Sequence, residues 1–490
     1  MIATFQYEGR SAITNGLDGA RVALATNTLR ETTFFRGTLG QPVIFREALA
    51  SLYDVVVSDF KYRSRDRLEY RAWLEQQDRA FLDRLAAGSR AARERVQELE
   101  ARLGELDRLR RDRLKPFHQA RKLYINYVYT YNYELAYILD PVITVHPDEV
   151  SFEAFSRDES TYARLAAKHE LFEQVDEFQC GTTNIDFSTR LHRELERNRS
   201  YRRTRFDIDP SGFAVSLGSG PSHIEKKVDL PESWVQGFLQ VQSVMAMGLT
   251  RFRMTPVDLY NIVRFLRRHK AKTSPRSLRY ELEPGRRVRV VLEPWNYTLE
   301  LSEVSTYDGP KPLSVRTWGR DRLRTLSRLI PASATIDVYL AGFGLPSVYV
   351  LDLGPIQFTL ALSGWTDNDW TSGTAKFDLL SRRLNVSPSE LTSVYESIRA
   401  LRFGNENQVA QSAGLGVEKT RSALSFLCQV GRSMFDLAGG VYRHRDLFLA
   451  PFSAQEAASA VKSLAPSDPR EAAAREIVAQ DQIRIIARRP

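Results

Sequence analysis

The chain has 490 residues, of which 43 % are hydrophobic and 26 % are charged, and its 69 Lys and Arg against 60 Asp and Glu give a net charge of +9. This balance excludes a disordered chain, a collagen-like chain and a small disulfide-stapled protein. The length exceeds what one hydrophobic core supports, so we expect several domains.

The two cysteines, Cys180 and Cys428, lie far apart in the sequence and form no CxxC motif. A secreted protein of this size usually carries more cysteines, paired as disulfides. The N-terminal residues MIATFQYEGR lack the basic segment and apolar run of a signal peptide, and the apolar stretches are too short to cross a bilayer. We therefore expect a cytoplasmic protein with no membrane segment.

Residues 1–60 contain short β-rich runs separated by the turn signals Asn15-Gly16 and Asp18-Gly19. They predict a β-rich N-terminal module with one helix at 45–53 and a further strand at 55–57, where three valines follow one another.

Residues 61–140 are rich in Arg, Glu, Leu and Ala and predict a long helical arm or hairpin. Apolar residues recur there at spacings of three and four, which is the heptad pattern of a coiled coil: Leu82, Leu85, Ala92, Val96, Leu99, Leu103 and Leu106. The heptad stripe packs either within the chain or against a second copy or a partner, and both interpretations remain open.

A mixed α/β segment, 141–235, precedes a basic α+β domain at 236–380. Residues 251–330 hold 18 Lys and Arg against 8 Asp and Glu, which accounts for the positive excess of the whole chain. A helix is predicted at 256–269 and strands at 278–283, 287–293 and 297–301. We predict a nucleic-acid-binding surface at the helix end and the following loop, formed by Arg267, Arg268, Lys270, Lys272, Arg276 and Arg279. The alternative is an Arg-rich face that pairs with carboxylates elsewhere in the chain.

Residues 381–450 predict helices at 388–401, 407–413 and 417–430, followed by a hairpin at 432–447. This is the order of a winged-helix domain. Its predicted contact residues are Lys419 and Arg421 on the third helix and Arg443 and Arg445 on the hairpin. Because groove-reading helices usually carry more cations, docking of a protein is as well supported as reading of DNA. Residues 451–490 form an Ala-, Ser- and Pro-rich C-terminal tail.

The sequence lacks the common nucleotide-binding and zinc-binding motifs. It contains no GxxxxGK[ST] and no complete GxGxxG, which excludes a P-loop, and it has neither HExxH nor CxxC. We therefore assign no catalytic residue, no metal ligand and no cofactor. An alternative function is a metal-dependent or hydrolytic enzyme, whose site would draw on Glu153, Asp158, Glu159, Cys180, Asp367 and Asp369.

Four strings carry a resemblance to a known family: DPVITVHPDEVSFEAFSRDESTYARL at 140–165, CGTTNIDFS at 180–188, LSGWTDNDW at 362–370 and GVYRHRDLF at 440–448. The chain resembles the region that precedes the zinc finger in bacterial SWIM zinc finger family proteins. The resemblance implies association with a MoxR-type AAA ATPase and a von Willebrand factor A protein. The CxC…CxH finger of that family does not occur in this sequence, so zinc binding is not carried over.

Together these features predict an α+β multidomain protein with a β-rich N-terminal module, a long helical arm, a basic middle domain and a C-terminal winged helix. The function that we expect is that of a non-enzymatic adaptor or scaffold in a multi-protein assembly, which binds nucleic acid through its basic domain.

Overall fold

The structure is a computed structural model, and it describes residues 12–16, 19–26, 33–60, 141–185, 189–196, 204–209, 232–364, 369–370 and 386–448, with single positions between 98 and 123 and between 452 and 458. The chain forms two compact units, one made of residues 1–61 and 139–490, the other of residues 62–138.

The second unit corresponds to the predicted arm, and its described positions between 98 and 123 are helical. Leu99, Leu103 and Leu106 of the heptad pattern are 51 %, 66 % and 57 % exposed. The earlier heptad positions, 82–96, lie outside the described residues.

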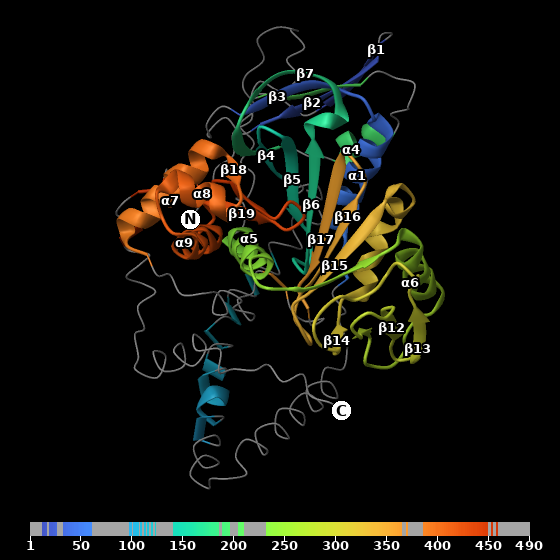
Figure 1. The fold of residues 1–490 in the computed structure, drawn as a ribbon. Helices are drawn as coiled ribbons and strands as arrows, with labels where there is room; N and C mark the ends of the chain where they lie inside the picture. Colours follow the sequence, from blue (N-terminus) through green and yellow to red (C-terminus); the bar gives the residue numbers. More distant parts are fainter. Residues whose placement is uncertain are drawn as a thin grey trace. The chain divides into compact units, whose positions relative to one another are not determined.

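In the described part of the first unit, four sheets form the framework (Figure 1). The largest is antiparallel throughout, in the order β10 (Thr250–Met254), β15 (Thr335–Leu340), β16 (Ser347–Asp352), β17 (Ile356–Leu362), β6 (Thr161–Lys168), β5 (Glu149–Phe155), β4 (Val142–Val145) and β8 (Gly181–Asn184). A five-stranded sheet has the order β1 (Ala12–Gly16), β2 (Gly19–Ala25), β9 (Thr204–Asp209), β3 (Phe34–Leu39) and β7 (Phe172–Gln179), with β2 and β9 parallel.

The two smaller sheets belong to the basic domain and to the C-terminal part. They are β13 (Tyr297–Glu300), β12 (Arg289–Leu292), β11 (Leu278–Leu282) and β14 (Leu313–Thr317), and β18 (Phe403–Gly404), β20 (Val441–His444) and β19 (Ser433–Asp436). The described helices of this unit are α1 (Pro42–Val57), α4 (Thr189–Glu196), α5 (Glu232–Met245), α6 (Pro256–Arg268), α7 (Pro388–Leu401), α8 (Glu406–Ala413) and α9 (Val417–Gln429), with 3-10 helices η2 (His169–Leu171), η3 (Arg320–Arg328) and η4 (Ile330–Ala332).

These sheets cross the segment boundaries that the sequence suggested. The eight-stranded sheet joins β17 of the expected basic domain to β6 of the expected mixed segment over seven residue pairs. The N-terminal strands β2 and β3 pair with β9 and β7, which lie far along the chain. Local turn signals do not reveal which distant strands pair. The predicted limit of the arm at 60 lies next to the division between the two units at residue 61.

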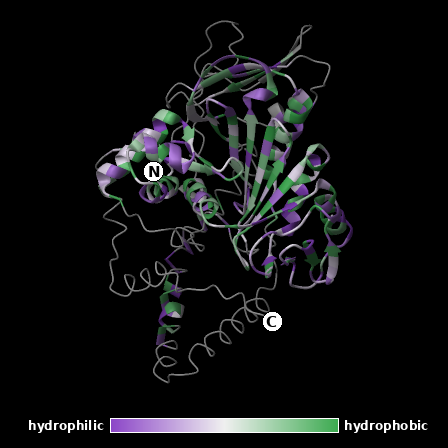
Figure 2. Cartoon of the chain, in the orientation of Figure 1, coloured by the Kyte–Doolittle hydropathy of each residue, from purple (hydrophilic) through white to green (hydrophobic). Residues whose placement is uncertain are grey.

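The core lies on both faces of the large sheet. Residues alternate between the faces of a strand, and on β5 Phe152 contacts Phe45 of α1 while Phe155 contacts Phe238 of α5, with ring centroids 6.2 and 4.9 Å apart. The strands β5 and β6 are buried along nearly their whole length, and the central strands carry mostly hydrophobic residues (Figure 2). The predicted strand at 55–57 is the last turn of α1, whose Val55 and Val56 are buried.

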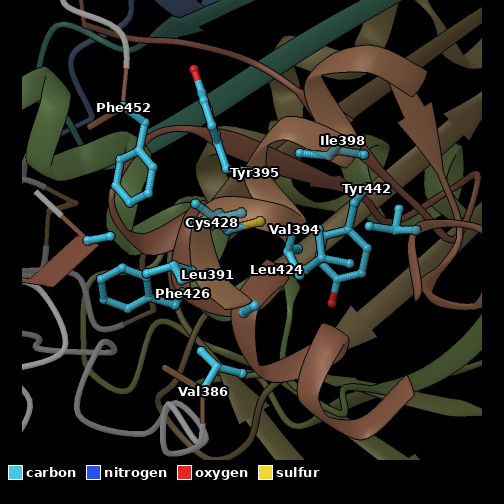
Figure 3. Packing of buried hydrophobic residues seen from close by; sticks show 14 residues of the cluster. Val386, Leu391, Val394, Tyr395, Ile398, Leu424, Phe426, Cys428, Tyr442 and Phe452 are labelled. Carbon is cyan, nitrogen blue, oxygen red and sulfur yellow. The ribbon is translucent and has the colours of Figure 1, made fainter. Parts of the chain in front are cut away.

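Residues 386–448, the C-terminal three-helix unit, match the predicted elements closely, and α7 begins and ends where the sequence indicated. Ser387 caps α7 and forms a capping box with Glu390. The three helices enclose a hydrophobic cluster around Leu424, Leu427 and Cys428, all fully buried (Figure 3). Burial raises the pKa of the Cys428 thiol to about 12, so this cysteine is a core residue.

Candidate nucleic-acid interface

Helix α6 positions the predicted cations, and its first turn is firmly anchored. Thr255 and Asp258 form a capping box, and Asp258 also accepts hydrogen bonds from the hydroxyls of Ser302 and Ser305, both at 2.8 Å. Burial acts to raise the pKa of Asp258, but these hydrogen bonds from the backbone and side chain of Thr255 and from the two serines hold it below its ordinary value. The helix therefore has a fixed direction relative to the sheet.

At the other end of α6, four of the six predicted cations are exposed: Arg267, Arg268, Lys270 and Lys272. Arg267 donates a hydrogen bond to Ser327 at 2.8 Å. Arg264, one turn earlier, is also exposed. Within the described residues, none of these five cations forms an ion pair with a carboxylate. We call Arg264, Arg267, Arg268, Lys270 and Lys272 the helix-end patch.

The other two predicted residues, Arg276 and Arg279, do not belong to this exposed group. Arg276 and Arg279 are half-buried. The Arg279 guanidinium lies 3.0 Å from Glu281 on its own strand and 3.5 Å from Glu293, which directly follows β12. Arg279 thus has carboxylate partners, unlike the exposed cations of the helix-end patch, and its part in binding nucleic acid stays a prediction.

The remaining arginines of this small sheet are likewise paired. Arg289 contacts Glu283 at 2.9 Å and Glu281 at 3.3 Å, Arg316 contacts Glu293 at 2.8 Å, and Arg287 pairs with Glu303. The pairing of arginines with carboxylates thus describes the small sheet, whereas nucleic-acid binding at the end of α6 stays a prediction. The sheet carries compensated charge, and the excess is concentrated at the end of α6.

Four aromatic side chains beside the patch were missed from the sequence. The Phe265 ring stacks on His269 at 4.1 Å and on Tyr297 at 4.7 Å, with interplanar angles of 19° and 9°. Trp295 meets Phe265 edge-on at 5.2 Å. The spacing of four between Phe265 and His269 on a predicted helix indicates that their rings lie side by side. Their contact with Tyr297 of β13 could not be predicted without the fold.

The winged-helix contact residues do not form a free cationic surface. Lys419 pairs with Glu390 at 2.7 Å, and Arg421 pairs with Glu406 at 2.6 Å. Arg443 and Arg445 are 5 % and 0 % exposed. Their prediction as hairpin contacts was wrong, because the hairpin faces the large sheet.

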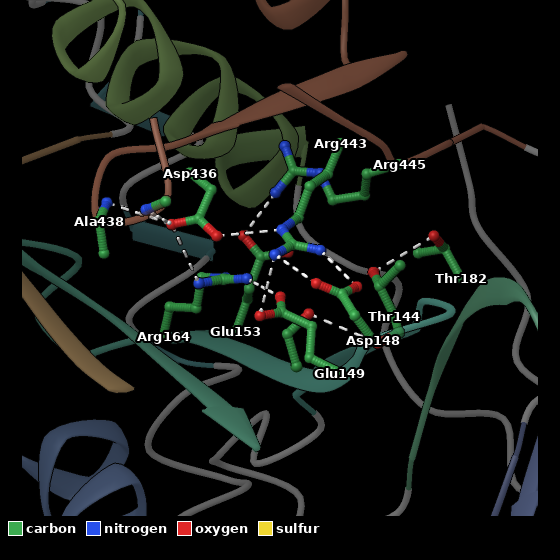
Figure 4. A network of polar contacts seen from close by, with 12 residues as sticks. Thr144, Asp148, Glu149, Glu153, Arg164, Thr182, Asp436, Ala438, Arg443 and Arg445 are labelled. Atoms are coloured by element: carbon green, nitrogen blue, oxygen red, sulfur yellow. Dashed lines mark hydrogen bonds and ion pairs between the residues drawn. The ribbon is translucent and has the colours of Figure 1, made fainter. Parts of the chain in front are cut away.

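A buried ionic network explains the burial of Arg443 (Figure 4). Its guanidinium contacts Asp436 on β19 at 3.0 Å, Asp148 at 2.8 Å and Glu149 at 3.2 Å, and Arg164 on β6 pairs with Glu149 as well. Burial favours the protonated form of Asp436, but Arg164 and Arg443 hold its pKa below the ordinary value. Next to it, Arg445 contacts Glu153 at 2.5 Å, and that carboxylate also accepts a hydrogen bond from Tyr162.

The residues of the alternative enzyme site are tied up separately. Glu153 is enclosed by Arg445 and Tyr162, while Asp158 accepts hydrogen bonds from Ser156 and Ser160, both at 2.6 Å. Glu159 is half-buried in the β5–β6 turn.

Cys180 is half-buried, and burial raises the pKa of its thiol, which disfavours the nucleophilic thiolate. Asp369 is buried, and Asp367 lies outside the described residues. Among the residues that the structure describes, no group of three or more His, Cys, Asp or Glu is arranged to hold a metal ion.

No protein-family model and no curated protein matches this chain. Among solved structures, it is similar to the proliferating cellular nuclear antigen from Entamoeba histolytica, with a TM-score of 0.38 and 8 % sequence identity over 67 % of this chain and 98 % of that chain. A likeness at this level carries no conclusion about function. Within the described part of the chain, no helix has the length and apolar character needed to span a membrane.

We predict that Arg443→Met lowers the free energy of unfolding by about 3–5 kcal/mol, because it removes one of the two arginines that pair with buried Glu149 and Asp436. Arg421→Met, which removes a half-exposed pair in the same three-helix unit, should cost less than about 1 kcal/mol. Urea denaturation followed by circular dichroism measures both. Equal losses would show that the network does not hold the unit to the sheet.

A pH effect follows from His146, which is 1 % exposed. Burial, with Arg443 and Arg164 nearby, lowers its pKa well below 6.5. The unfolded chain then binds a proton that the folded protein excludes, so stability is full above pH 6.5 and falls as the pH drops below it. When the pH is lowered from 7.5 to 5.0, the free energy of unfolding of the His146→Gln variant should fall by about 2 kcal/mol less than that of the unchanged protein. Parallel losses in urea denaturation at the two pH values would contradict this assignment.

Proposed function

We propose that this protein is a non-enzymatic, nucleic-acid-binding adaptor whose binding surface is the helix-end patch. The observation that carries the proposal is the division of charge in the basic domain: arginines on the sheet have carboxylate partners, and the five cations of the patch have none within the described residues. An ion-paired arginine must lose its partner before it can contact a phosphate, whereas an unpaired one is available at once.

Phosphate chemistry fits this surface better than a single small anion. The patch is a stretch of exposed side chains along a helix end and the loop after it, which suits a repeating polyanion. Lys270 and Lys272 lie in the loop after α6. Their side chains can therefore follow the curved sugar–phosphate backbone of a nucleic acid.

The adaptor role rests on two other features. The order of α7, α8, α9 and the β19–β20 hairpin is that of a winged helix, whose hairpin cations are occupied in the ionic network. We therefore assign the exposed side of this unit to protein docking. The exposed leucines of the arm, Leu99, Leu103 and Leu106, offer a second docking stripe. By resemblance, the partners would be a MoxR-type AAA ATPase and a von Willebrand factor A protein in the cytoplasm.

Replacing Arg268, Lys270 and Lys272 together by Gln should weaken binding to labelled DNA and RNA by at least about tenfold at about 50 mM salt, and should reduce the slope of log affinity against log salt by about 2–3. Fluorescence anisotropy across a salt series measures both quantities.

The matched control replaces Arg286, Arg287 and Arg289 by Gln. It removes the same charge from the same domain but takes side chains that already have carboxylate partners. This control variant should bind nucleic acid with an affinity within about twofold of the unchanged protein, since arginines that are paired with carboxylates make few contacts with phosphates. The proposal fails if the control weakens binding as much as the patch variant, or if the unchanged protein binds neither DNA nor RNA at low salt.

A further inference from the structure

The aromatic rings beside the helix-end patch form an ordered column. Tyr297, Phe265 and His269 stack in that order, with interplanar angles of 9° and 19° between successive rings. Phe265 in the middle is half-buried, while the terminal rings are exposed, Tyr297 by 47 %. The column thus has a supported centre and two rings whose surfaces reach the solvent.

The column is held from several sides. Trp295 meets Phe265 and His269 edge-on, with centroids 5.2 and 5.9 Å away, and the guanidinium of buried Arg320 lies 4.8 Å from the Trp295 ring centroid. A ring nitrogen of His269 lies 3.0 Å from the backbone oxygen of Phe265. Because the rings are already positioned, a flat ligand that stacks on them orders little further structure.

Arg268 lies beside this column, because it follows Phe265 by three residues, a spacing at which helical side chains are neighbours. Arg268 and Arg264, four residues apart on α6, are both exposed. Lys270 directly follows His269 in the chain. A ligand with flat rings and regularly spaced negative charges would engage both groups at once.

We infer that the column stacks the unpaired bases of single-stranded nucleic acid, while the helix-end patch grips the adjoining phosphates. This inference rests on the proposed function and narrows it to one ligand class. Bases in a duplex hide their faces in the stack, whereas the bases of a single strand expose them to aromatic side chains. A column of rings gives a duplex-binding surface no advantage.

The test compares three labelled ligands of equal length with the full-length protein: oligothymidylate, an abasic strand with the same number of phosphates, and a DNA duplex. Oligothymidylate should bind about tenfold more tightly than the abasic strand, which has the charges but no bases. Tyr297→Ala should weaken oligothymidylate binding about tenfold and leave the abasic strand unchanged. Tyr297→Phe keeps the ring and should restore binding.

Tyr260→Ala is the matched control, since Tyr260 is an equally exposed tyrosine on α6, at 50 %, that takes no part in the column. It should leave all three affinities unchanged. Equal binding of oligothymidylate and the abasic strand, or preference for the duplex, overturns the stacking inference. In that case the proposed function survives if the triple Gln variant of the patch still loses affinity. Absence of binding to every ligand removes both.

Discussion

The arrangement of the first unit depends on a buried set of arginine–carboxylate contacts between the three-helix unit and the large sheet. Glu149 on β5 pairs with Arg164 on β6, and Arg443 on β20 also pairs with Glu149. Moving such charges out of water is costly, and the cost is offset only when every partner is in place. The network therefore admits one position of the unit on the sheet, whereas apolar surfaces alone would tolerate sliding.

That constraint redirects the function of the C-terminal elements. A hairpin arginine that neutralises Glu149 is not free for a phosphate, although the same hairpin in isolation would expose a cationic wing. Helix α5 reinforces the arrangement, because it packs Phe238 on β5 and β6 and accepts a hydrogen bond from Phe435 on β19 through Gln242 at 2.7 Å. Exposed residues of this unit lie on α7, on α8, at the start of α9 and in the turn between β19 and β20.

Local elements were predictable because their signals are local. Helix α7 has its cap at Ser387, α6 has its cap at Thr255, and the strands of the basic domain follow alternating patterns. The strand predicted at Val55 to Val57 failed because burial against the sheet outweighs the β preference of valine. Sheet membership and the burial of Arg443 were out of reach, since each depends on residues more than a hundred positions away.

The free cations, by contrast, had a sequence signal that charge counting overlooked. From Arg264 to Tyr280 there is no Asp or Glu, whereas the strands that follow contain an acid near each arginine. In an antiparallel sheet such acids lie within reach across the strands. A helix end followed by a loop has no such neighbours. The net charge of a domain therefore says little about which of its cations can bind a ligand. What matters is whether the fold places a carboxylate next to each cation. At the end of α6 the neighbouring side chains are aromatic rings instead.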